Sequence, residues 1–171
     1  MIRVLSLLFC FVVLLVLQIC FVNSLPFPLK CTPIVLAASV FFLQHISVPS
    51  AIWWIVFEGM FIDLLGIGLA PFEIVSHSIA AFGIVFAANK LFTNRSYYGL
   101  CATFFIGAVL LTGMEILMGV FGVILDNPTT NVKDIVLFWA YATPISFLLF
   151  MMCFPFSKSI KKIIDLLNPI E

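Results

Sequence analysis

Three carboxyl groups and one imidazole stand in sequence that is otherwise apolar. Glu58 and Asp63 lie in "WWIVFEGMFIDLLGIG" at residues 53–68, followed by His77 and, much later, Glu115. A charged side chain at the centre of a bilayer costs about 2.5–3.5 kcal/mol on insertion scales, so such residues usually face a protein interior. There they can fix helix register through hydrogen bonds, contact another membrane protein, or bind a substrate or proton. The residues alone leave these three interpretations open.

The spacing of these residues predicts which of them meet. A turn is expected near Ala70 and Pro71, with Asp63 seven residues before Ala70 and His77 seven residues after it. At about 1.5 Å per residue, both lie roughly 10 Å from the same surface, so an antiparallel hairpin would pair them. Glu58 is rotated by about 140° from Asp63 on the same helix and is expected to face the bundle interior or a partner helix.

The polar candidates separate into two groups by their predicted depth. Glu73, Asp126 and Asp134 are expected at helix ends or in loops, where water solvates them. The residues expected to matter inside the bundle or at an interface are Glu58, Gly59, Asp63, Pro71, His77 and Glu115.

The composition requires a membrane setting for these groups. Of 171 residues, 64% are hydrophobic and 9% are charged, and the mean hydropathy is +1.27. Soluble domains are nearer half apolar and a quarter charged. Eight basic and eight acidic residues leave no net charge, which argues against a nucleic-acid partner because little is available to neutralise phosphates.

Hydropathy predicts one integral membrane domain over residues 1–171, an all-α bundle of six spans. A helix needs about 20 apolar residues to cross the hydrocarbon. The tail at 157–171 is expected to form an amphipathic helix on the cytoplasmic surface, with its lysines near anionic lipid. The predicted spans are 4–22, 31–47, 49–70, 72–92, 98–125 and 135–156.

The distribution of basic residues predicts the orientation of these spans. Six spans place six Lys and Arg residues on one side and only Lys30 and Lys133 on the other, so both termini are expected in the cytoplasm. Aromatic residues near the span ends are expected to form interfacial belts; they are Trp53, Trp54, Tyr97, Tyr98, Trp139 and Tyr141.

Small residues predict where helices approach closely. Small-xxx-small spacing lets helix backbones come together in a membrane. The residues concerned are Ser76, Ala80, Gly83 and Ala87 in one span, and Gly107, Gly113, Gly119 and Gly122 in the next.

No motif in the chain predicts catalysis or a cofactor. The five cysteines are scattered singly, without a CxxC or Cys/His spacing that would indicate a metal site or a redox pair. The sequence also lacks HExxH, the P-loop pattern, GxSG and GxGD. We therefore expect a non-enzymatic protein without a metal or cofactor.

The region from Leu17 to about Leu117 resembles the rod-shape-determining membrane protein family MreD. The first span ends in "VLQ" at 16–18, and the proline-containing connector and second span read "LPFPLKCTPIVLAA" at 25–38. A Gly-x-x-x-Asp-Leu-Leu motif follows, and the turn "GIGLAPFE" at 66–73 has Glu73 where the family has glycine. The motif residues are Gly59, Asp63, Leu64 and Leu65, and Lys90 and Arg95 supply the basic loop that the family has next.

The resemblance implies a structural component of the cell-elongation complex in the bacterial inner membrane, supporting cell shape and peptidoglycan synthesis. It implies direct contact with an MreC-like scaffold protein, and indirect contact with MreB, RodA and a class B penicillin-binding transpeptidase. The alternative is the substrate-binding S subunit of an energy-coupling-factor importer, which also has about six spans. In that case the acidic cluster would bind a small molecule or metal ion.

Overall fold

The apolar stretches form helices, because a helix satisfies its backbone hydrogen bonds without water. The computed structural model describes residues 2–27, 29–45, 48–91, 97–125 and 131–153, and no strand occurs among them. The predicted all-α class is therefore confirmed. The α-helices of this described part are α1 (Ile2–Val16), α2 (Ile34–His45), α3 (Val48–Leu65), α4 (Glu73–Phe86), α5 (Tyr97–Ile124) and α6 (Val132–Cys153).

Four helices are long and apolar enough to cross a membrane, which is characteristic of a multi-pass membrane protein. Two of them include short π-helical turns, η1 (Leu17–Phe21) after α1 and η4 (Ala87–Leu91) after α4. The four segments are Leu5–Ser24, Val48–Leu65, Glu73–Leu91 and Tyr98–Ile124, and they correspond to the first, third, fourth and fifth predicted spans.

The second and sixth predicted spans are not among these four segments. At 12 residues, α2 is about 18 Å long, which is shorter than the roughly 30 Å of hydrocarbon that a span must cross. The 22 residues of α6 are enough to cross a membrane. Its first turn contains Lys133 and Asp134, and Pro144 lies inside the helix. That α6 crosses the membrane therefore stays a prediction. The amphipathic tail predicted at 157–171 lies outside the described residues.

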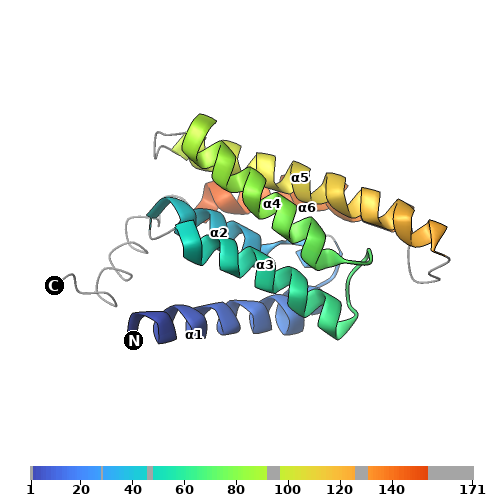
Figure 1. The fold of residues 1–171 in the computed structure, drawn as a ribbon, viewed down its shortest axis with the longest axis horizontal. Coiled ribbons are helices and arrows are strands. Elements are labelled where there is room, and N and C mark those ends of the chain that lie inside the picture. Colours follow the sequence, from blue (N-terminus) through green and yellow to red (C-terminus); the bar gives the residue numbers. More distant parts are fainter. Residues whose placement is uncertain (1, 28, 46–47, 92–96, 126–130, 154–171) are drawn as a thin grey trace.

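The helices lie side by side along the long axis of the molecule (Figure 1). The closest neighbours are α3 with α4, α4 with α5, α2 with α3, and α5 with α6. Figure 1 shows the start of α1 at one end of the bundle and the turn between α3 and α4 at the other. We call this second end, formed by residues 66–72 and the helix ends around them, the turn end.

Small residues bring α4 and α5 together, as predicted for part of the set, whereas Gly113 has nothing within 4 Å of its Cβ position and the prediction was wrong for it. Ser76, Ala80 and Ala87 are fully or almost fully buried along α4. A Cβ atom on Gly107 of α5 would lie 2.5 Å from the Ile84 side chain, and one on Gly83 of α4 would collide with Leu110. These two glycines therefore set the distance between the helices.

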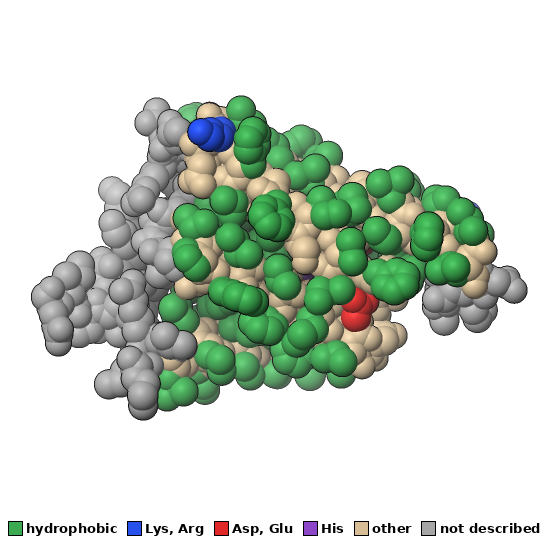
Figure 2. All heavy atoms as spheres, in the orientation of Figure 1, with side chains coloured by type: hydrophobic (Ala, Val, Ile, Leu, Met, Phe, Trp, Pro, Cys, Tyr) green, Lys and Arg blue, Asp and Glu red, His purple; other side chains and the backbone are tan. Residues whose placement is uncertain are grey.

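The outer surface is mostly apolar, as Figure 2 shows for one face of the molecule. Trp53, Tyr98 and Tyr141 are exposed, as expected of interfacial residues. The prediction was wrong for Trp54 and Trp139, which are only 5% and 4% exposed. The predicted belt assumed that a residue near a span end faces outward, but the helix rotation turns both indole rings into the bundle. The side chain of Tyr97 lies outside the description.

The connector after α1 folds back onto the bundle through Gln18. It contains two 3-10 turns, η2 (Val22–Ser24) and η3 (Leu29–Cys31). The Gln18 amide donates to the carbonyl oxygen of Thr32 at 2.9 Å and accepts from the backbone N–H of Ile34 at 2.7 Å. One side chain thus joins the end of the first span to the start of α2, and it places the connector over the turn end.

Candidate functional site

At the turn end, α3 ends in a regular pattern of backbone hydrogen bonds. Gly66 has a φ of +62°, a left-handed conformation that glycine adopts without a steric penalty. Its N–H donates to the carbonyl of Asp63 at 3.2 Å, and the N–H of Ile67 donates to the carbonyl of Ile62 at 3.3 Å. This pair of bonds is the Schellman motif, which ends a helix and satisfies its last carbonyls.

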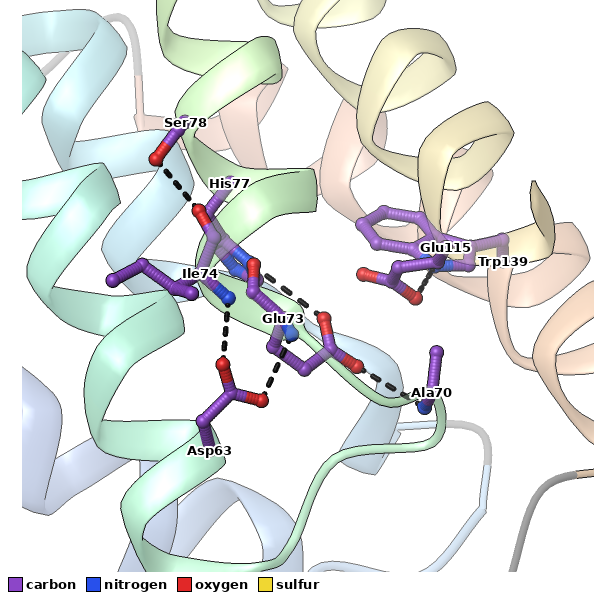
Figure 3. Close-up of polar contacts among 8 residues, drawn as sticks. All are labelled: Asp63, Ala70, Glu73, Ile74, His77, Ser78, Glu115 and Trp139. Atoms are coloured by element: carbon purple, nitrogen blue, oxygen red, sulfur yellow. Dashed lines mark hydrogen bonds and ion pairs between the residues drawn. The ribbon is translucent and has the colours of Figure 1, made fainter. Parts of the chain in front are cut away.

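Asp63 holds the beginning of α4 from the end of α3. One carboxylate oxygen accepts from the backbone N–H of Glu73 at 2.8 Å, and the other accepts from the N–H of Ile74 at 2.9 Å (Figure 3). Phe72, the local N-cap residue, provides no side-chain cap and has a φ of 61°. The Asp63 carboxylate therefore replaces the missing cap. Its negative charge also interacts favourably with the positive N-terminal end of the α4 dipole.

His77 has a different partner from the predicted one. Its Nδ1 lies 2.8 Å from the backbone oxygen of Glu73 and 3.7 Å from the Glu73 Oε2 atom. The expected hairpin does bring Asp63 and the start of α4 together, but Asp63 bonds to backbone amides instead of the imidazole. The amides are the nearer donors because the turn places the first residues of α4 directly beside the carboxylate.

Gly59 allows this close contact between α3 and α4. A Cβ atom at Gly59 would lie 2.8 Å from both the Glu73 carbonyl oxygen and the His77 Cβ. A Cβ at Gly68 would lie 2.8 Å from the Glu73 Cγ. Pro71 is half-buried in the turn itself. Of the predicted candidates, Gly59, Asp63, Pro71 and His77 thus all belong to the hairpin, with the glycine giving the space and the aspartate the hydrogen bonds.

A cavity of about 310 Å³ lies at the turn end between the helices. Three glutamates from three different helices line it: Glu58 of α3, Glu73 of α4 and Glu115 of α5. Each is no more than 5% exposed. The structure thus brings together Glu58, Glu115 and His77 of the predicted candidates, whereas Asp63 does not line the cavity. Figure 3 shows the side chains of Glu73 and Glu115 extending into the same space.

The three glutamates differ in how their oxygens are bonded. Glu115 Oε2 accepts from the Trp139 indole N–H at 2.6 Å, and Glu73 Oε1 accepts from the Ala70 N–H at 3.2 Å. Glu58 Oε2 and Glu73 Oε2 are buried with no hydrogen-bond partner. Leaving a buried polar group unsatisfied costs about 1–3 kcal/mol, so each such group needs an explanation.

Glu73 and Trp139 are the cavity residues that the sequence reasoning missed. Glu73 was expected to be solvated at a span end, and this was wrong, because the side chain is 3% exposed. A signal was available: Glu73, His77, Ala80 and Ile84 follow helical spacing and all fall on the buried face of α4. The prediction considered only how far along its helix Glu73 lies. A side chain at a helix end can still be buried under the neighbouring turn.

The cavity offers hydrogen-bond acceptors in an apolar setting. Among the residues that the structure describes, no three His, Cys, Asp or Glu side chains gather closely enough to hold a metal ion. The arrangement suits a group that donates hydrogen bonds, such as an ammonium, amide or hydroxyl group. Comparison of the chain with protein-family models, curated proteins and solved structures gives no match.

Proposed function

We propose that this chain is a non-catalytic component of the bacterial cell-elongation complex that acts through contacts with partner membrane proteins. The observation that carries the proposal is the role of the motif residues that resemble the MreD family. Asp63 caps α4 from α3 across a contact that only a glycine at position 59 permits. Gly59 and Asp63, two of the motif residues that carry the resemblance, therefore build the hairpin.

A second part of the resemblance supports the same proposal. Gln18, the last residue of the "VLQ" segment, bonds to both sides of the connector at Thr32 and Ile34. Two separate motifs thus have structural roles, as expected of a protein whose function is to present a shaped surface. The proposed partners are an MreC-like scaffold protein directly, and MreB, RodA and a class B penicillin-binding transpeptidase indirectly, in the bacterial inner membrane.

The test is to purify the tagged protein from its native membrane in mild detergent and to identify co-purifying proteins by mass spectrometry. The expected result is an MreC-like protein with peptidoglycan synthases. The Asp63→Leu variant should recover less of this complex, because α4 loses its cap and shifts against α3. Unchanged complex formation and unchanged cell shape with Asp63→Leu would contradict the proposal.

The second candidate is the binding subunit of an energy-coupling-factor importer. The observation in its favour is the cavity with two unpartnered carboxylate oxygens, because a binding subunit needs an enclosed polar site. The same purification distinguishes the two candidates. Paired ATPases with a large transmembrane coupling subunit would replace the elongation proteins in the eluate.

A further inference from the structure

The cavity at the turn end has more acceptors than the protein itself satisfies. Glu58 is 5% exposed and Glu73 is 3% exposed, and each has an Oε2 atom that accepts no hydrogen bond, with His77 Nδ1 3.7 Å from that of Glu73. Buried carboxyl oxygens are normally paired because the loss of hydration is not otherwise offset. A ligand that donates hydrogen bonds would supply the missing partners.

Three carboxyl groups gather in the buried part of the cavity, because Glu58, Glu73 and Glu115 line it from three helices and each is no more than 5% exposed. Among the described residues that line the cavity, the basic ones are Lys30 and His77. Lys30 is exposed on the connector, and the Nδ1 atom of His77 lies 2.8 Å from the backbone oxygen of Glu73. The buried part of the cavity thus has three carboxyl groups against one imidazole, an excess that favours a cationic ligand.

The other walls of the cavity limit the size and character of the ligand. Leu36, Ile62 and Leu111 supply apolar surface. Trp139 holds the carboxyl group of Glu115 through its indole N–H. About 310 Å³ is at the small end of ligand pockets, so the ligand must be small, with a short apolar body.

We propose that this cavity binds a small aliphatic amine in its ammonium form, with the charged group among Glu58, Glu73 and Glu115 and the carbon chain along the apolar wall. An ammonium group has three N–H donors and no acceptor, which matches the Glu58 and Glu73 oxygens that accept no hydrogen bond in a cavity that Glu115 also lines. This site does not depend on the proposed cellular role, because its test uses the isolated chain and needs no partner protein.

The test is calorimetric titration of the full chain in lipid nanodiscs with n-pentylamine, using 1-pentanol as a neutral probe of the same length. We expect saturable binding of the amine and none of the alcohol. Glu58→Gln and Glu115→Gln should each weaken amine binding by about ten-fold or more, because each removes a carboxyl partner of a buried ammonium group. The matched control is Asp134→Asn, which removes an exposed carboxylate outside the cavity and should leave the affinity unchanged.

Several outcomes would overturn the proposal. These are no saturable binding of the amine, equal binding of the alcohol, or a loss with Asp134→Asn as large as that with Glu58→Gln. Size-exclusion profiles and thermal unfolding show whether each variant is folded. If Glu58→Gln does not fold, the comparison of amine with alcohol on the wild-type chain and the Glu115→Gln variant decide the question.

Discussion

At the scale of single residues, the hairpin depends on one carboxylate that serves as the cap of another helix. Asp63 is exposed, but both of its oxygens accept hydrogen bonds from the first amides of α4. An exposed carboxylate usually contributes little as an ion pair, whereas a helix cap contributes through donors that have no other partner. Asp63 is therefore a structural residue in spite of its charge.

We predict that Asp63→Leu lowers the free energy of unfolding by about 0.5–2 kcal/mol, the usual range for loss of an N-cap. Asp63→Asn should cost less, because the amide oxygen keeps one acceptor for the α4 amides. Thermal unfolding in detergent, followed by fluorescence-detected size exclusion, measures both variants. Equal melting temperatures for Asp63→Leu and wild type would show that the cap does not stabilise the hairpin.

At the scale of helices, glycines decide which pairs can approach. Gly59 faces α4, where a Cβ atom would lie 2.8 Å from a backbone oxygen and from the His77 side chain. Gly113, on α5, has nothing within 4 Å of its Cβ position. The two glycines look alike in the sequence, and only their neighbours distinguish a packing residue from a tolerated one.

We predict opposite results for alanine at these two positions. Gly59→Ala should destabilise the protein by about 1–3 kcal/mol, because the added methyl group forces α3 and α4 apart. Gly113→Ala is the matched control and should be neutral or stabilising by up to about 1 kcal/mol, because alanine favours a helix. The same unfolding assay compares them, and equal losses for both variants would contradict the assigned α3–α4 contact.

At the scale of the whole molecule, the arrangement of the helices brings together residues far apart in the sequence. Glu58, Glu73 and Glu115 come from three helices, and Trp139 comes from a fourth. The first span adds Gln18 to the same cavity, and the connector after it adds Lys30. If both termini are cytoplasmic, as the basic residues predict, the turn end and its cavity face the outer side of the membrane.

The orientation can be tested by cysteine labelling in intact cells. Lys133, in the first turn of α6, and Lys90, in η4, are both exposed. In a background without the five native cysteines, a membrane-impermeant maleimide should modify the Lys133→Cys variant and not the Lys90→Cys variant. The reverse pattern would invert the orientation, and labelling of both would contradict a membrane between the two sites.

The sequence alone determined the membrane class, the helical fold and the approximate limits of the four long apolar helices. Apolar length and backbone hydrogen bonding leave a chain in lipid few alternatives, so composition is enough for these conclusions. It also predicted correctly that Glu58 and Glu115 face the interior, but it was wrong for Asp63, which is exposed. Its prediction of small residues at the contact between α4 and α5 was right for Gly83 and Gly107 and wrong for Gly113. These properties depend on the cost of exposing charge to lipid and on the space between helices.

Only the tertiary structure decided the partners of these residues and the role of Glu73. The sequence placed Asp63 and His77 at the same depth and predicted that they pair. In the structure, Asp63 instead accepts hydrogen bonds from the first amides of α4, and His77 contacts the backbone oxygen of Glu73. Helix rotation turned Trp54 and Trp139 inward, and the short α2 left its predicted span incomplete. Hydropathy fixes how deep a residue lies but not the direction in which its side chain points, because direction depends on how each helix packs against its neighbours.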